Sequence, residues 1–245
     1  LGYNDYRILF WCTISQGEIM TYRELINQVL IRLREDTVAS DWSGAINDSS
    51  TVNDYQKVIG SLINDAKRSI ESYHDWLVLR ETVNVSTVAS TKNYNLSSGQ
   101  EFKVLDVVNN STGNQLSQTT LQYLNSIKYP TDPTGEPNYY AFNGADSSNN
   151  LKVDLSPIPT EAQTISFDIV KYQDELTSST TSIKIPSKPV ILGAYARAIA
   201  ERGEDGGTQS SIAAQEAASS LAQAVMLDSG NTKYENDWFV STNYQ

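Results

Sequence analysis

The chain has 245 residues, of which 39% are hydrophobic, and its 29 acidic and 18 basic side chains give a formal net charge of −11. A chain of this length can bury a full core, in one large domain or in two small ones. The negative charge argues against a general phosphate-binding surface, so DNA binding through a basic face is not expected.

Residues 1–19 are expected to form an N-terminal extension. Their apolar run, ILFWC, is too short for a signal-peptide core or a transmembrane span. Two interpretations stay open: an ordered extension that docks on a neighbour, which we favour, or a read-through upstream of a usual start at Met20. No other segment is long or apolar enough to span a bilayer, which predicts a soluble protein.

Residues 20–76 are expected to form a pair of helices. Thr21 and Glu24 have the spacing of a capping box, in which each side chain satisfies a free backbone amide of the first turn. Apolar side chains then repeat on one face of each helix, and because short helices are marginal in water, both faces need a packing partner. The two stripes are Leu25, Ile26, Val29, Leu30 and Leu33, followed by Tyr55, Val58, Ile59, Leu62, Ile63, Ala66, Ile70 and Tyr73.

Residues 77–185 are expected to form an inserted antiparallel β-domain of six to eight strands. Apolar side chains alternate along its first segment, and the rest of the range is rich in Ser, Thr, Asn and β-branched residues. The pair Asn143–Gly144 predicts a hairpin turn. The alternating residues are Leu77, Leu79, Val83 and Val85.

Residues 186–230 are expected to form a second helix pair. Pro189 suits a first helical turn, Gly203 suits the C-cap of the first helix, and Gly230 is the expected stop of the second. The high Ala content favours close approach, so the sequence predicts a tight helical hairpin.

Residues 231–245 form a polar tail that carries four aromatic side chains. Aromatic residues are enriched at interface hot spots, and these have no local core to enter. The sequence therefore favours a tail that docks in trans, with a disordered tail as the alternative. The predicted interface residues are Tyr234, Trp238, Phe239 and Tyr244.

These segments predict an α+β fold: a helical bundle of two N-terminal and two C-terminal helices, with an inserted antiparallel β-domain and an extended C-terminal tail. The expected domains are residues 1–19, 20–76, 77–185, 186–230 and 231–245.

No residue pattern indicates a reaction centre, so we expect no enzyme, no cofactor and no metal site. The single cysteine, Cys12, excludes an intramolecular disulfide, and the single histidine, His74, is expected at a helix end. Two segments weakly resemble cation loops, although a helix-to-helix turn and a hairpin loop fit them better. These are GEDGG at 203–207, and the segment 144–154 with Asp146, Asn149, Asn150 and Asp154.

Paired-carboxylate hydrolysis needs two carboxylates held at a defined separation. Nothing in the sequence shows that its acidic residues near the N-terminus face one another, and pairs are expected by chance in an acidic chain. These residues are Glu18, Glu24, Glu35 and Asp36.

Three helical segments together resemble the head-to-tail adaptor, or connector, proteins of tailed bacteriophages. The order of helix pair, β-insertion, helix pair and tail is also similar, and the resemblance covers about residues 20–230, leaving 1–19 outside it. The segments are MTYRELINQVLIRLRED (20–36), VIGSLINDAKRSIESYHDW (58–76) and PVILGAYARAIAERGEDGG (189–207).

The resemblance implies a structural protein of the virion neck, present in the host cytoplasm during assembly. Such adaptors form rings, generally twelve-fold, between the portal and the tail nozzle, and the genome passes through the ring during ejection without specific binding. The implied partners are copies of the chain itself, the portal protein, the nozzle protein and tail fibres. An acidic ring suits this role because it repels duplex phosphates.

Two other functions stay open. A receptor- or carbohydrate-binding tail protein would use Tyr139, Tyr140 and Phe142, which are expected in a loop. A connector with cell-wall lyase activity is the second alternative.

Overall fold

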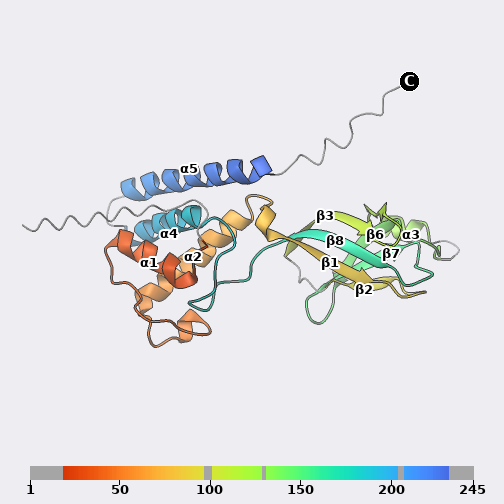
Figure 1. Cartoon of the computed structure of the whole chain (residues 1–245), viewed down its shortest axis with the longest axis horizontal. Coiled ribbons are helices and arrows are strands. Elements are labelled where there is room, and N and C mark those ends of the chain that lie inside the picture. The colour runs from red at the N-terminus through yellow and green to blue at the C-terminus, as the bar shows by residue number, and fades with distance from the viewer. Residues whose placement is uncertain (1–18, 97–100, 129–130, 204–206, 232–245) are drawn as a thin grey trace, which may run out of the picture. The chain divides into compact units, whose positions relative to one another are not determined.

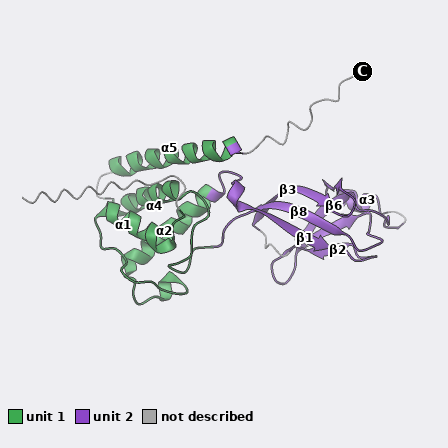
Figure 2. Ribbon diagram, in the orientation of Figure 1, with its two compact units in different colours: residues 1–70, 175–230 green, residues 71–174, 231–245 purple. Residues whose placement is uncertain are grey.

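The computed structural model describes residues 19–96, 101–128, 131–203 and 207–231, which form five α-helices and eight β-strands (Figure 1). The chain divides into two compact units (Figure 2). The helical unit comprises residues 1–70 and 175–230, and the β unit comprises residues 71–174 and 231–245. The expected mixture of α and β structure is confirmed.

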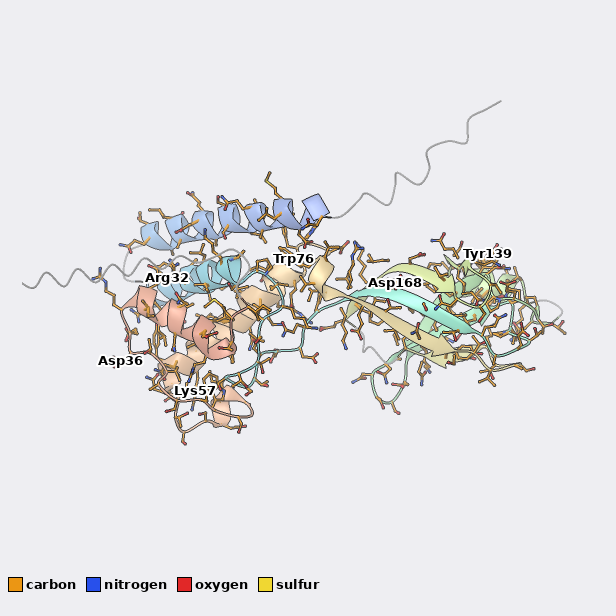
Figure 3. All side chains as sticks on the ribbon, viewed as in Figure 1. Arg32, Asp36, Lys57, Trp76, Tyr139 and Asp168 are labelled. Atoms are coloured by element: carbon orange, nitrogen blue, oxygen red, sulfur yellow. The ribbon has the colours of Figure 1, made fainter. Side chains whose placement is uncertain are left out.

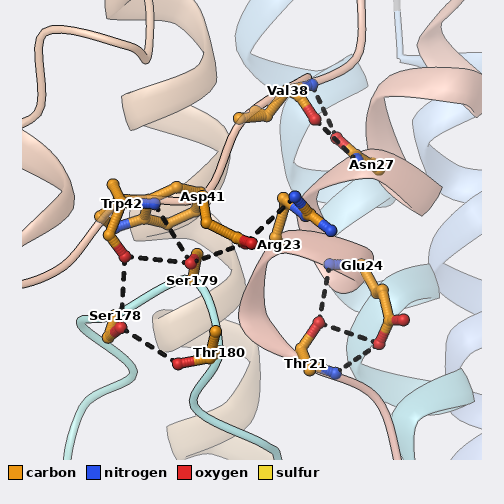
Figure 4. Close-up of polar contacts among 10 residues, drawn as sticks. All are labelled: Thr21, Arg23, Glu24, Asn27, Val38, Asp41, Trp42, Ser178, Ser179 and Thr180. Atoms are coloured by element: carbon orange, nitrogen blue, oxygen red, sulfur yellow. Dashed lines mark hydrogen bonds and ion pairs between the residues drawn. The ribbon is translucent and has the colours of Figure 1, made fainter.

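Helix α1, Tyr22–Leu33, begins at the predicted capping box. The backbone N–H of Thr21 donates to Glu24 Oε2 at 2.7 Å, and the backbone N–H of Glu24 donates to Thr21 Oγ1 at 3.4 Å (Figure 4). The predicted apolar stripe is buried at Leu25, Ile26, Val29 and Leu30. The local signal and the packing therefore agree for this helix.

Helix α2, Asp54–Glu71, ends five residues before the end of the range 20–76 predicted for the first helix pair. The chain turns after Glu71 and buries Trp76 completely, with its ring edge-to-face on His74 at a centroid distance of 5.1 Å. The predicted stripe is buried at its centre, but Val58 near its start and Tyr73 at its end are 36% and 67% exposed, so their expected burial is wrong.

Helix α4, Ser187–Arg202, has Pro189 in its first turn and Gly203 in the left-handed conformation at its C-cap, as predicted. It meets α2 at Gly193, where an added Cβ would lie 3.5 Å from that of Ala66. At Gly60 of α2, an added Cβ would lie 2.5 Å from Tyr22 Oη. These approaches bring α2 close to both α1 and α4.

Arg202 joins three helices at one end of the helical unit. Its guanidinium donates to Glu35, just after α1, at 2.5 Å and to the Tyr55 hydroxyl on α2 at 2.8 Å. It also lies over the Tyr55 ring, 4.9 Å from the centroid. The last residue of α4 is therefore fixed beside the end of α1 and the start of α2.

Helix α5, Thr208–Asn231, runs through Gly230, so the predicted stop at Gly230 is wrong. The Ser229 hydroxyl donates to the Val225 carbonyl at 2.7 Å, a bond that follows the helical turn and supports it at this point. Only Ala213 and Ser220 of α5 are fully buried. The tight hairpin of α4 and α5 stays a prediction.

A loop around Trp42 is tied to the segment that returns from the β unit. The Trp42 backbone N–H donates to Ser179 Oγ at 3.2 Å, and Ser179 Oγ lies 2.9 Å from Asp41 Oδ1 (Figure 4). Asp41 also pairs with Arg23 of α1 at 3.0 Å. This network fixes two loops that are distant in sequence against the same helix.

The β unit contains two four-stranded sheets. Strands β1 (Arg80–Ser86), β8 (Thr164–Lys171), β3 (Phe102–Asn109) and β4 (Asn114–Gln115) form one sheet in that order. Strands β2 (Asn93–Asn95), β7 (Leu151–Ser156), β6 (Tyr139–Ala145) and β5 (Ser117–Gln118) form the other. All pairs are antiparallel except β5 with β6, an exception to the predicted antiparallel domain.

The inner faces of both sheets form one hydrophobic core, as in a β-sandwich. Val85 is buried there, and Val83 packs against the core, as their alternation predicted. Leu77 and Leu79 lie instead in a short 3-10 helix that precedes β1. The buried core residues are Val85, Tyr94, Leu96, Val107, Leu116, Tyr140, Val153, Leu155, Ile165, Phe167 and Ile169.

Asn143–Gly144 does not form the predicted hairpin turn. Both residues lie within β6, where the register against β7 shifts between Phe142 and Ala145, and Gly144 has φ of +69°. The chain reverses instead at residues 146–150, so the left-handed glycine serves a β-bulge.

A short helix, α3 (Leu121–Ser126), packs on β6 and was not predicted. Its N-cap Thr120 accepts from the Tyr123 backbone N–H at 3.2 Å. Tyr123 packs edge-to-face on Tyr139 of β6 at a centroid distance of 5.6 Å.

The β unit leaves and rejoins the chain at neighbouring points. The backbone N–H of Gln173 donates to Glu71 Oε1 at 3.3 Å. Within the helical unit, the Asn64 side chain bonds both the N–H and the carbonyl of Leu176, at 3.0 and 3.1 Å. Both ends of the insertion are therefore anchored close to α2.

Candidate interaction surfaces

Two of the carboxylates considered for hydrolysis and the single histidine hold structural positions. Glu24 caps α1, Glu35 binds Arg202, and half-buried His74 packs on Trp76 after the end of α2. Glu18, Cys12 and the centre of the GEDGG segment lie outside the described residues. Within the described ranges, no group of three or more His, Cys, Asp or Glu side chains could hold a metal ion.

Asp146 closes the hairpin loop between β6 and β7. Its Oδ1 accepts from the backbone N–H groups of Ser148 and Asn150, both at 2.8 Å, and its Oδ2 accepts from the side-chain amide of Asn95 at 3.1 Å. Chiefly because of the bond from the Asn150 backbone, the pKa of Asp146 is lowered. This carboxylate is occupied by N–H donors, which supports the hairpin-loop interpretation of this segment.

Asp154, the other carboxylate of this segment, is nearly buried on β7. It accepts from the side-chain amides of Asn93 at 2.5 Å and Asn143 at 3.1 Å. These neighbours come from β2 and β6, on either side of β7. The buried charge is thus held by amide donors across three strands, and its role is structural.

The aromatic residues proposed for carbohydrate binding do not lie in a loop. Tyr139, Tyr140 and Phe142 are all on β6, and Tyr140 is 4% exposed and packs edge-to-face on Phe167 of the core. Burial, with the charge of Asp106 as a second cause, raises the pKa of the Tyr140 hydroxyl. Phe142 packs against the same core. The sugar-binding interpretation therefore loses two of its three residues, because alternation along the strand turns them inward.

The outer face of the first sheet is a polar surface that the sequence analysis missed. Asp168 of β8 (labelled in Figure 3) stands opposite Asp106 of β3 and Thr82 of β1 in the strand register. Thr82 Oγ1 donates to Asp168 Oδ1, and the Gln115 amide donates to Asp106 Oδ1, both at 2.5 Å. Each carboxylate has its own donor, which offsets the repulsion between like charges on adjacent strands.

Negative charge is concentrated in the β unit. Residues 71–174 carry 12 acidic and 6 basic side chains, whereas residues 19–70 and 175–230 together carry 13 and 10. Helix α5 carries Glu216 and Asp228 and no basic residue. Acidic side chains therefore outnumber basic ones by six in the β unit and by three in these parts of the helical unit.

Helix α5 exposes one long face, here called the outer α5 face. It follows the helical repeat through Ile212, Glu216, Ser219, Gln223 and Met226, all of them exposed. Ile212 is 60% and Met226 75% exposed, and their neighbour Leu227 is 59% exposed. Apolar residues that extend beyond a single stripe of one helix are the signal that could have identified this face from the sequence.

A second exposed apolar site lies at the end of α1. Ile31 is 57% exposed, and Arg34, at the C-cap, is exposed with φ of 58°.

The predicted interface residues of the tail, Tyr234, Trp238, Phe239 and Tyr244, lie outside the described residues. Among the described helices, none combines the length and apolarity needed to cross a bilayer.

Helices α1 and α5 expose large apolar side chains. In a comparison with known families, the model described as SU10 adaptor protein matches residues 20–238. The chain belongs to this family and is a phage adaptor-type structural protein. No curated protein matches it.

Proposed function

We propose that the chain is a head-to-tail adaptor that forms a ring between the portal and the tail nozzle of a phage particle. The genome passes through this ring during ejection. The partners are other copies of the chain, the portal protein, the nozzle protein and tail fibres. The site of action is the virion neck, after assembly in the host cytoplasm.

The family match over residues 20–238 carries this proposal, because it includes both units and most of the tail. The surface supports it as well. Helix α5 presents exposed apolar side chains without any basic residue, and the β unit concentrates the negative charge. A ring of such chains repels duplex phosphates and does not retain DNA.

Mass photometry of the purified chain, alone and mixed with a portal ring, tests the proposal. We expect a defined complex of several copies on one portal ring. A chain that never joins the portal ring would contradict the head-to-tail role.

The tail is proposed to provide attachment to the portal. Deletion of residues 231–245, which contain Tyr234, Trp238, Phe239 and Tyr244, is expected to abolish attachment and leave the far-ultraviolet circular dichroism essentially unchanged. A matched variant with these four aromatics changed to Ser separates loss of side chains from loss of backbone. Unchanged attachment of both variants would show that the portal contact lies elsewhere in the chain.

A further inference from the structure

We propose that the outer α5 face packs against the C-terminal end of α1 in a second copy of this chain. The inference rests on the ring function proposed above and names the surfaces that join neighbouring copies.

Helix α5 carries two neighbouring stripes that differ in burial. It has 24 residues, so it is about 36 Å long. One stripe carries buried Ala213 and Ser220, and a second stripe, about 90° away around the helix, carries exposed Ile212 and Met226. Among the described residues, the chain buries the first stripe and leaves the second exposed.

The end of α1 complements this face in both polarity and charge. Ile31 and Arg34 are three residues apart, and Ile212 and Glu216 are four apart, so each pair places an exposed apolar side chain beside a charged one. The two charges are opposite. Neither Glu216 nor Arg34 makes an ion pair with another residue that the structure describes.

Both surfaces lie at the same end of the helical unit. Arg202, the last residue of α4, contacts Glu35 directly after α1, and α5 begins at Thr208. Copies placed side by side around an axis can therefore bring the first turns of α5 against the end of α1. Because the two surfaces differ, their contact is heterologous, and a heterologous contact that closes produces a ring.

Charge reversal in the full-length chain tests the pairing. Self-association is measured by sedimentation velocity over a concentration series. We expect Glu216→Lys and Arg34→Glu each to weaken association about tenfold, and the double variant to recover most of it, because reversing both charges restores attraction. Glu81→Lys, at an exposed position on β1, makes the same charge change and is expected to leave association unchanged.

Two aspartate substitutions, at apolar residues of almost equal exposure, test whether the outer α5 face makes the contact. Ile212→Asp is expected to abolish association, whereas Val88→Asp, at a β-unit side chain of almost equal exposure (59% against 60%), is expected to leave it intact. Circular dichroism checks that both variants are folded.

Four outcomes would overturn the inference. If wild type associates and neither Ile212→Asp nor Glu216→Lys weakens it, α5 is not the contact. If both single charge variants weaken association and the double variant does not recover, α1 is not its partner. A wild type that binds a portal ring but never self-associates also overturns the inference, while the head-to-tail role stands. A wild type that does neither overturns both.

Discussion

Gly60 and Gly193 are both glycines inside helices, but their surroundings give opposite expectations for a substitution by alanine. At Gly60 the new Cβ would lie 2.5 Å from Tyr22 Oη and 2.8 Å from Ile46 Cδ1, atoms of two buried side chains. At Gly193 it would lie 3.5 Å from the Ala66 Cβ, an ordinary contact.

We expect Gly60→Ala to lower the free energy of unfolding by about 1–3 kcal/mol, because overpacking displaces buried groups. Gly193→Ala is expected to raise it by up to about 1 kcal/mol, because Ala favours the helix over Gly. Urea denaturation of the two variants measures both effects. Equal effects at the two positions would show that the close approach at Gly60 is relaxed in solution.

Tyr22 gives the helical unit a sensitivity to alkaline pH. Burial, reinforced by the charge of Glu175, raises the pKa of its hydroxyl far above the ordinary value. Above about pH 10 this tyrosine is ionised in the unfolded chain but not in the folded chain. The contribution of Tyr22 to the free energy of unfolding is therefore fully present below about pH 10 and is lost as the pH rises further.

Each pH unit above 10 is expected to cost about 1.4 kcal/mol through Tyr22 alone. Tyr22→Phe removes this contribution, and Tyr73→Phe, at a 67% exposed tyrosine, should not. Urea denaturation at pH 8 and pH 10.5 compares the variants. Parallel losses in all three proteins would mean that Tyr22 ionises in the folded chain.

At the scale of residues, the sequence identified features whose signal is local. Thr21 and Glu24 are three residues apart and cap each other, so their spacing was sufficient. Tyr140 and Phe142 could not be placed in the same way, because whether a strand residue faces the core depends on partners far along the chain, such as Phe167.

At the scale of elements, too, local sequence signals were not sufficient where pairing with distant strands or burial decides the structure. The pair Asn143–Gly144 predicted a turn because glycine accepts a positive φ, and Gly144 does adopt one. A bulge uses the same conformation as a turn, and only pairing with β7 distinguishes them. Helix α2 also ends before its apolar pattern does, because burial of Trp76 requires a turn.

The hairpin between β6 and β7 depends on the charged form of Asp146. Its pKa is lowered, so the contribution of its hydrogen bonds is present above the ordinary Asp pKa of about 3.9 and is lost as the pH falls through the lower folded value. A carboxyl titration by NMR is expected to place the Asp146 midpoint below that of an exposed aspartate.

Added Ca²⁺ is expected to leave the Asp146 titration unchanged, since Ser148, Asn150 and Asn95 already donate to this carboxylate. Asp146→Ala should shift the amide signals of 146–150 while leaving those of the core strands in place. A midpoint that moves with Ca²⁺ would contradict this description and indicate a bound ion.

The whole molecule contains two units with separate cores, and the β unit is expected to fold alone. Eleven buried side chains, nine from the strands and two from the adjoining connections, form its core, and its ends meet at Glu71 and Gln173. A fragment of residues 71–174 is therefore expected to give a dispersed NMR spectrum and cooperative unfolding.

Phe167→Ala in the same fragment serves as the control. It removes a fully buried ring from the core and is expected to cost about 3–5 kcal/mol, enough to unfold a small domain. An unfolded wild-type fragment would show that the β unit needs the helical unit to fold.

At this scale the sequence predicted the α+β class, because helical and strand periodicities change abruptly along the chain. It could not assign strand order, since β8 lies between β1 and β3 although it comes last in sequence. The outer α5 face was also not predicted, because the high Ala content of this segment indicates only the close approach of a neighbouring helix.

The meeting of Glu71 and Gln173 has a further consequence for how such a protein can change over generations. A module whose two ends touch can be exchanged as a block for another of different size. The exchange leaves the sequence of α2 and of the segment after residue 174 unchanged. One recombination event can then exchange the whole β unit and keep the helical unit, where stepwise substitution would have to rebuild a shared core.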